Sequence, residues 1–238
     1  MKLIKIKEVG FTLSEVLITL GIIGIVAALT IPSLMRKIDN YQRVVRFKLM
    51  YSKLVNAWNL AVADFGYMPA CGYNPLNVNV SIRKDCTEFG KLIINHLKIA
   101  KICKNNALAN GCITEDFTGA DDVYRDNNKD YTDEQIASLE LGSGLSKASI
   151  RTEKTAIVLA DGTYLIFYQN YNPMVILIDI NGNKGPNKWG YDIFPLQTFW
   201  STIDNQTVEL KAWARPIKHS GGFTTQEMLN KIRNNKKE

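Results

Sequence analysis

The sequence is poor in the residues and patterns that enzymes need. Only two histidines occur in 238 residues, His96 and His219, and they stand far apart in the chain. There is no HExxH pattern, no glycine-rich phosphate loop, and no serine, histidine and acid set whose spacing suggests a triad. We therefore predict that the protein is not an enzyme and interpret His96 as an ordinary helix residue.

The chain also lacks a strong charge imbalance. Its 29 basic and 23 acidic residues give a formal net charge of +6, which is modest for this length and does not require nucleic acid as a partner. Hydrophobic residues make up 46% of the chain, which is enough for most of it to fold around a buried core as one or two domains.

The four cysteines form no CxxC pair, which argues against a zinc site or a thioredoxin-like centre. They stand at Cys71, Cys86, Cys103 and Cys112. In an exported protein this even, clustered set indicates two disulfide bonds, whereas in the cytosol it indicates buried reduced thiols. Of the three pairings, we favour Cys71–Cys86 with Cys103–Cys112, because each closes a short local loop.

A long apolar run occupies the N-terminal part of the chain. From Phe11 to Met35 nearly every residue is apolar or small, and about twenty residues in a helix cross the roughly 30 Å of a bilayer core. A secretory signal peptide has a shorter apolar region that ends in a cleavage site, and a plain membrane anchor is the other interpretation. Neither explains Glu15, because an ionised carboxylate within a span is costly unless it is paired.

The residues around Glu15 form a specific pattern. A short basic leader ends at Gly10, and the order Gly-Phe-Thr-Leu-Ser-Glu places Glu15 four positions after Phe11. This segment closely resembles the N-terminus of type IV prepilins and of the pseudopilins of type II secretion systems. Gly24 and Pro32 fall where many members of that family carry a glycine and a proline, and they are expected to kink or loosen the helix.

The resemblance implies a processing step and a mode of assembly. A prepilin peptidase would cleave after Gly10 on the cytoplasmic side and methylate the new amine of Phe11. The lysines of the leader (residues 1–10) would hold that leader in the cytoplasm. In filaments of this family the glutamate is thought to meet the amine of a neighbouring subunit. Glu15 is therefore expected to act in assembly, where pairing offsets the cost of burying either charge alone.

The implied location and partners follow from this processing. The chain would be a single-pass protein of a bacterial inner membrane, with its N-terminus in the cytoplasm and lipid around its helix before assembly. It would meet the prepilin peptidase, the inner-membrane assembly platform and other pilin or pseudopilin subunits. After assembly its head would lie in a periplasmic or extracellular filament.

A helical pattern continues beyond the apolar run. Apolar residues from Val44 to Phe65 recur every three or four positions, which predicts an amphipathic helix that Gly66 ends as a C-cap. We expect one long helix over residues 11–65, of which residues 11–35 would cross the membrane.

The remaining residues predict a head with helices first and strands later. Residues 66–147 are expected to be irregular and disulfide-bearing, with short helices over 88–101 and after a capping box at Thr132–Gln135. Residues 148–218 are expected to form an antiparallel sheet that begins with a two-residue hairpin at Asp161-Gly162. This order predicts an α+β fold in which the long helix packs on an antiparallel sheet, as in a pilin head.

One loop of the head contains a candidate calcium site. Asp179, Asn181 and Asn183 alternate as at the start of many oxygen-rich Ca²⁺ loops, and Asp192 stands where it can close such a site. The glycine is at the fourth place rather than the sixth, however, and no glutamate stands at the twelfth. A metal-free Asn-Gly turn is therefore the favoured interpretation, and no cofactor is predicted with certainty.

Residues 219–238 are expected to form a basic tail with a short helix that opens on a capping box from Thr224 to Glu227. The basic charge of this tail is compatible with nucleic acid as a partner, but no other feature of the sequence supports such binding.

The main functional prediction is a structural subunit of a type IV pilus-like or type II secretion pseudopilus filament. One alternative is a minor or tip subunit that contacts DNA, a surface or a secreted substrate. The other is a protein of different function on a single-span anchor, which the missing catalytic patterns disfavour.

Overall fold

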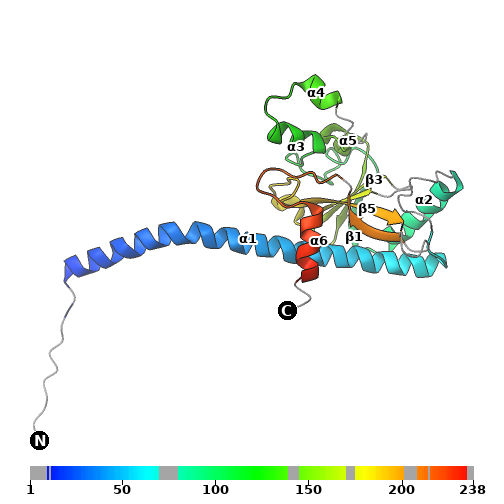
Figure 1. Cartoon of the computed structure of the whole chain (residues 1–238). Coiled ribbons are helices and arrows are strands. Elements are labelled where there is room, and N and C mark those ends of the chain that lie inside the picture. The colour runs from blue at the N-terminus through cyan, green and yellow to red at the C-terminus, as the bar shows by residue number, and fades with distance from the viewer. Residues whose placement is uncertain are drawn as a thin grey trace, which may run out of the picture. The chain divides into compact units, whose positions relative to one another are not determined.

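The computed structural model in Figure 1 describes residues 10, 12–69, 80–138, 145–169, 175–200, 208–213 and 215–234 of the chain. The chain divides into two compact units, Met1–Gln42 and Arg43–Glu238. Helix α1 (Leu13–Phe65) is continuous through both units, which confirms the predicted long helix. The described helix begins at Leu13, two residues after the predicted start.

Helix α1 ends as its sequence predicts. Gly66 has a φ of 85°, a left-handed conformation that costs glycine little because it has no Cβ. Its N–H donates a hydrogen bond to the Val62 carbonyl at 3.0 Å. One of the last carbonyls of the helix is thereby satisfied, and Gly66 is confirmed as the C-cap glycine.

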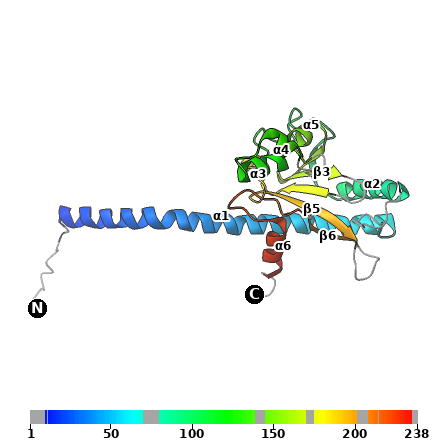
Figure 2. The same ribbon diagram turned by 45° about the horizontal axis from the view of Figure 1, so that its top comes forward.

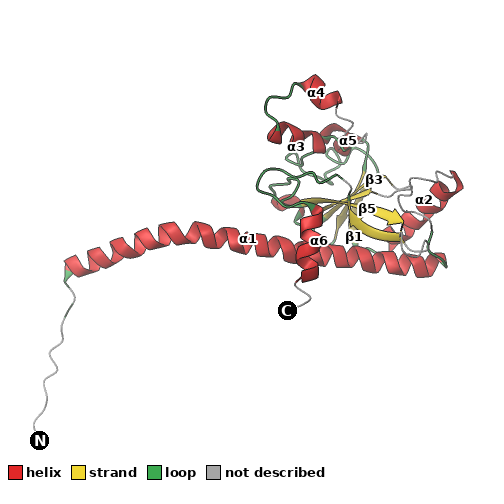
Figure 3. Ribbon diagram, in the orientation of Figure 1, coloured by secondary structure: helices red, strands yellow, loops and turns green. Residues whose placement is uncertain are grey.

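A six-stranded antiparallel sheet forms the centre of the second unit (Figure 3). Its strands lie side by side in the order in which they occur in the chain, so each pairs with its neighbours in sequence. The strands are β1 (Ile99–Cys103), β2 (Thr155–Leu159), β3 (Tyr164–Gln169), β4 (Val175–Asp179), β5 (Ile193–Trp200) and β6 (Val208–Ala212). The fold is therefore α+β, as predicted.

The first strand of the sheet was not predicted. The expected helix over residues 88–101 is wrong at its end: helix α2 (Val80–Asn95) stops before that point, and Ile99–Cys103 forms strand β1. This strand pairs antiparallel with β2, for example through Ile102 opposite Ile157. A partner from a distant part of the chain thus outweighs the local helical pattern.

The other helices of the head are short. They are α3 (Ala120–Asn127), α4 (Asp133–Ser138), α5 (Lys147–Thr152), the 3₁₀ turn η1 (Gly182–Lys184) and α6 (Thr225–Asn234). Both predicted capping boxes are confirmed. The Thr132 N–H donates to the Gln135 side chain at 2.8 Å, and the Thr224 N–H donates to Glu227 at 2.7 Å. In each box the returning bond to the threonine hydroxyl is also present.

The hairpin between β2 and β3 is confirmed, but its loop is longer than predicted. The Leu159 N–H donates to the Thr163 carbonyl, so residues 160–162 form the loop instead of the two residues Asp161 and Gly162. Gly162 has a φ of 85° at the last loop position, where three-residue hairpin loops favour a left-handed residue.

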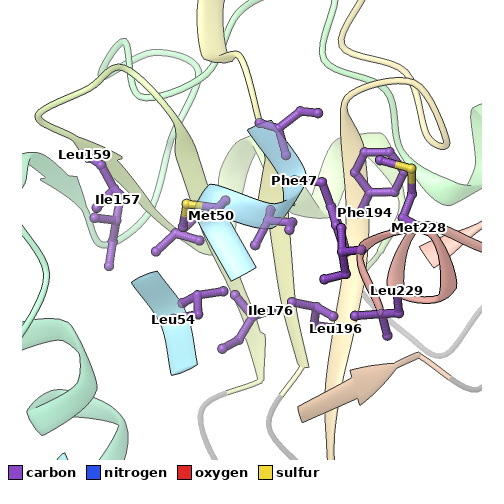
Figure 4. Close-up of a cluster of buried hydrophobic side chains, with 14 of the residues drawn as sticks. Phe47, Met50, Leu54, Ile157, Leu159, Ile176, Phe194, Leu196, Met228 and Leu229 are labelled. Atoms are coloured by element: carbon purple, nitrogen blue, oxygen red, sulfur yellow. The ribbon is translucent and has the colours of Figure 1, made fainter. Parts of the chain in front are cut away.

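One face of the sheet is covered by residues 43–65 of α1 together with α6 (Figures 1 and 2). Phe47 lies at the centre of this core, and its ring meets that of Phe194 edge to face with 5.1 Å between centroids. Figure 4 shows how the side chains of α1, the sheet and α6 meet there. The labelled residues are Phe47, Met50, Leu54, Ile157, Leu159, Ile176, Phe194, Leu196, Met228 and Leu229.

The opposite face of the sheet is covered by the segment that carries α3 to α5 (Figure 2). Because both faces of the sheet are covered, the sequence of strand β4 is apolar on both sides. Ile176 and Ile178 belong to the core beneath α1, while Leu177 belongs to the core on the other face. Because both faces are buried, every residue of β4 is buried and the strand is a continuous apolar run except for Asp179 at its end.

A third core joins α2 to the last turns of α1. Trp58 of α1 and Phe89 of α2 meet edge to face, with ring centroids 4.8 Å apart. Cys86 is fully buried in the same cluster. Beside this core, His96 follows α2 and its Nε2 lies 2.7 Å from an oxygen of Asp64 near the end of α1.

Candidate functional site

The N-terminal part of α1 is a strongly apolar helix. Within the described residues, α1 is the one helix that is long and apolar enough to cross a membrane, with a mean hydropathy of 2.3 in its most apolar window. Its large side chains are exposed in the isolated chain, from Leu13 at 77% to Leu29 at 75%. An exposed apolar surface of this extent requires lipid or protein around it, so the helix is evidence that the protein is anchored by a single membrane span.

Glu15 lies in the first turn of this helix and closes a capping box. Its Oε2 accepts hydrogen bonds from the Thr12 N–H and the Thr12 hydroxyl, each at 2.8 Å. The Glu15 N–H donates in return to the Thr12 hydroxyl oxygen at 3.3 Å. Glu15 thus already has a role within its own chain, because these bonds satisfy backbone groups that a helix start leaves without partners.

This capping role had a signal in the sequence. Thr12-Leu-Ser-Glu15 matches the pattern S/T-x-x-E, the same pattern that correctly predicted the start of α6. It was missed because Glu15 was interpreted only through an expected partner in another subunit. The two roles are separable by chemistry, since glutamine can close a capping box but carries no charge.

The other residues of the processing motif are only partly described. Gly10 is exposed, and apart from its two chain neighbours no described residue has an atom within 4 Å of the place where a Cβ would stand. Phe11 lies outside the described residues, so cleavage and N-methylation stay predictions. Gly24 and Pro32 lie within a helix that is continuous past both of them, and the kink expected there also stays a prediction.

The disulfide-bearing residues 66–147, called the cysteine-rich segment below, have one described disulfide. Cys103 and Cys112 are joined as predicted, with 6.2 Å between their Cα atoms, and both are buried. The bond ties the end of edge strand β1 to the segment that covers one face of the sheet. Cys71 lies outside the described residues, so the pairing of Cys71 with the buried Cys86 stays a prediction.

The predicted calcium residues lie at the end of β4 and in the β4–β5 loop (residues 180–192). Asp179, at the end of β4, is fully buried, and its Oδ1 accepts hydrogen bonds from the N–H groups of Asn181 at 3.0 Å and Gly182 at 2.8 Å. This is an Asx turn made by the aspartate. The metal-free interpretation placed local backbone hydrogen bonds on the asparagines, and Asn181 makes one of them, from Nδ2 to the Gly185 carbonyl at 3.0 Å. Asn183 faces another element, since its Oδ1 accepts a hydrogen bond from the Tyr164 hydroxyl of β3.

Asp192 holds the other end of the loop. Its Oδ2 accepts from the Asn187 N–H at 2.9 Å, and its Oδ1 accepts from the Lys188 N–H at 2.6 Å. Burial raises the pKa of the Asp192 carboxyl. Burial also raises the pKa of Asp179 well above its ordinary range, and the nearby charge of Asp192 adds to the effect.

Asn187 connects this loop to the cysteine-rich segment and was not predicted as a site residue. Its Nδ2 donates to the Thr114 hydroxyl at 2.7 Å and to Asp116 Oδ1 at 2.8 Å. Burial acts to raise the pKa of Asp116, but hydrogen bonds from Thr114 and Asn187 outweigh it and lower the pKa overall. No local pattern marks Asn187, because its partners lie far away in the sequence.

Among the described residues, no three histidine, cysteine or acidic side chains come together as a group that could hold a metal ion. The Nδ1 atom of His219 lies 2.8 Å from Asp126 and connects the C-terminal segment to α3. His96 and His219 each connect two elements of the head.

Comparison of the chain with family models, with curated proteins and with solved structures gives no match. Function is therefore inferred from the residues and contacts of the chain itself.

Proposed function

We propose that the protein is a structural subunit of a type IV pilus-like or type II secretion pseudopilus filament. It is made as a prepilin, cleaved after Gly10, N-methylated at Phe11 and assembled through the N-terminal part of α1. The observation that carries this proposal is the placement of the processing motif. The motif (residues 10–15) runs into the first turn of an exposed apolar helix, and that helix continues without a break into the core of an α+β head.

The exposed apolar surface of α1 supports the proposal that the protein moves from lipid into a filament. Its side chains need an apolar environment, and burial contributes about 25 cal/mol for each Å² removed from water. Lipid provides that environment before assembly, and the helices of neighbouring subunits provide it afterwards. A soluble enzyme on a plain anchor needs only the first of these environments and has no use for an acidic residue in the span.

The position of Glu15 supports the same proposal. The carboxylate stands at the first turn of α1, four residues after the amine that cleavage would create at Phe11. Two opposite charges about 4 Å apart attract by about 4 kcal/mol at an effective dielectric constant of about 20. Desolvation offsets part of this attraction, so the pair favours the register in which both charges are matched over registers that leave either charge alone.

The first experiment is an intact-mass measurement on protein purified from its native membranes. The expected mass lacks residues 1–10 and carries one additional methyl group. A control variant, Gly10→Leu, places a bulky side chain at the cleavage site and is expected to keep the full-length mass. Full-length mass in the wild-type protein would refute the proposal, because assembly through Phe11 requires its free amine.

A further inference from the structure

A small cavity in the second unit is lined by more positive than negative side chains. It has a volume of about 190 Å³ and is formed by α1, the β2–β3 hairpin and the β4–β5 loop. Its charged lining residues are Arg46 and Lys53 of α1, Lys184 of the loop and Asp161 of the hairpin. Three cations therefore share the cavity with one carboxylate, and like charges at close range repel each other unless an anion lies between them.

The carboxylate in this lining is already used by the chain. Asp161 Oδ2 accepts a hydrogen bond from the Lys53 ammonium. Asp161 Oδ1 accepts from the Thr163 N–H at 3.2 Å and from the Thr163 hydroxyl at 2.7 Å. Neither Arg46 nor Lys184 forms an ion pair with an acidic side chain of the described residues. The cavity thus keeps two positive charges that no described carboxylate balances.

The cations reach the cavity from two separate elements. Arg46 and Lys53 are seven residues apart, which is close to two turns of a helix, so they lie on one face of α1 together with Leu49 and Met50. Lys184 comes from the 3₁₀ turn η1 that follows β4. An anion in the cavity would therefore connect the long helix to the β4–β5 loop.

We propose that this cavity binds a phosphate group through Arg46, Lys53 and Lys184. A guanidinium can donate two parallel N–H bonds to a phosphate, and an ammonium with three N–H groups can hold Asp161 and still donate to the ligand. The oxygens of a phosphate point in several directions and can accept from two elements at once, whereas the two oxygens of a carboxylate lie in one plane. This inference does not depend on the proposed filament function.

The phosphate has two possible sources, the headgroup of a membrane lipid or a free phosphate, and both present the same oxygens to the cavity. Lys53 and Asp161 also line a larger cavity of about 500 Å³. Ala57, Leu60 and Leu159 contribute apolar surface to that larger cavity. An acyl chain of a bound lipid would find an apolar environment there, whereas a free phosphate would leave it unused.

Equilibrium dialysis measures the binding with the full-length protein in a neutral detergent. The protein is freed of phosphate and dialysed against ³²P-labelled inorganic phosphate, while sodium chloride holds the ionic strength constant because salt screens exposed charges. We expect saturable binding of one phosphate per chain. Phospholipid that stays with the protein after detergent extraction is measured in parallel from its phosphorus content.

Two pairs of variants localise the site. Lys184→Gln and Arg46→Gln each remove one cation of the cavity and should weaken phosphate binding about tenfold, the loss expected for one hydrogen bond to a charged group. Lys188→Gln and Lys48→Gln are the matched controls, because they remove the same charge from the same loop and the same helix at exposed positions that do not line the cavity. The controls are expected to bind as the wild type does.

The same variants distinguish the two sources. If the phosphate belongs to a membrane lipid, the wild type and the two controls should retain about one more phospholipid per chain than Lys184→Gln does. If the phosphate is free, all four variants should retain as much phospholipid as the wild type, and only the binding of inorganic phosphate should fall in Lys184→Gln and Arg46→Gln.

Lys184→Gln keeps the inference testable if Arg46→Gln does not fold. Lys184 is exposed, and its side chain makes no hydrogen bond in the described contacts. The inference is overturned if the wild type shows neither saturable phosphate binding nor a phospholipid that Lys184→Gln loses. Equal phosphate binding by the wild type and Lys184→Gln also overturns it. So does equal weakening in Lys188→Gln, which would indicate a general effect of net charge.

Discussion

The charge of Glu15 can be separated from its capping role by substitution to glutamine. Glu15→Gln keeps a side chain that can accept from the Thr12 N–H and hydroxyl, so the start of α1 is expected to be preserved. It removes the negative charge that would meet the amine of Phe11. If the charge acts in assembly, Glu15→Gln should therefore assemble as poorly as Glu15→Ala.

The expected magnitudes differ enough to be measured. An attraction of about 4 kcal/mol, reduced by desolvation to a net contribution of about 1–3 kcal/mol, corresponds to roughly a 5- to 150-fold loss in the equilibrium for adding a subunit. Loss of a helix cap alone costs about 0.5–2 kcal/mol, and it acts on the helix start in the membrane as much as in the filament. The cap therefore contributes little to the difference between the two states.

Thr12→Val provides the matched control, because it removes the capping hydroxyl, keeps the shape of the side chain and leaves Glu15 charged. Each variant is produced in cells that lack the wild-type protein, filaments are sheared off and pelleted, and the pelleted amount is divided by the amount in the membrane. We expect Thr12→Val to stay within about twofold of the wild type, the change that about 0.4 kcal/mol produces. Wild-type incorporation of Glu15→Gln, or equal loss in Thr12→Val and Glu15→Ala, would refute the role of the charge.

Three further predictions concern the head. Phe47→Ala empties the centre of the core beneath α1 and should lower the free energy of unfolding by about 3–5 kcal/mol in denaturant titrations. A hydrogen bond from the Thr224 N–H and a smaller effect of one from Lys218 lower the pKa of Glu227 below its ordinary 4.5. The stability that this carboxylate gives the folded head is therefore fully present above pH 4.5 and is lost as the pH falls through the lowered pKa. Glu227→Gln should therefore flatten this part of the acid unfolding curve. Cys112→Ser should expose the Cys103 thiol to labelling and destabilise the head by about 2–4 kcal/mol.

Each of these predictions has an outcome that contradicts it. Leu49→Ala, on the exposed side of α1, should change stability by less than about 0.5 kcal/mol, and an effect as large as that of Phe47→Ala would contradict the assignment of the buried face. An acid unfolding curve that is identical in Glu227→Gln and the wild type would remove the capping carboxylate as a source of pH dependence. Equal labelling of Cys103 in the wild type and in Cys112→Ser would reject the disulfide.

The parts of the fold that local signals determine were predictable. Helix α1 has a continuous apolar pattern and ends at Gly66, and α4 and α6 each begin at a capping box. The β2–β3 hairpin was recognisable because its turn residues are adjacent in the chain. Strand β1 was not, since what makes Ile99–Cys103 a strand is a partner that follows the whole of the cysteine-rich segment.

The candidate site residues also divide into those that a local pattern marks and those that depend on distant contacts. Glu15 was found because a carboxylate in an apolar run is costly, and the residues from Asp179 to Asn183 were singled out as a candidate calcium loop because they alternate over a few positions. Asn187 was missed because its contacts to Thr114 and Asp116 join two loops that only the folded sheet brings together. Asn183 was overestimated for the same reason, since Tyr164 on a neighbouring strand uses its oxygen.

The order of the strands in the sheet has a consequence for folding. From β2 to β6 the paired strands are joined by short connections in the chain, so most of the sheet has a low contact order and can form by adding successive hairpins. Strand β1 is different, as the bond between the Thr155 hydroxyl and the Lys104 carbonyl spans 51 residues. Closing that loop carries an entropic cost that the hairpins avoid. The meander is therefore expected to form early, with the docking of β1 as the late step that completes the head.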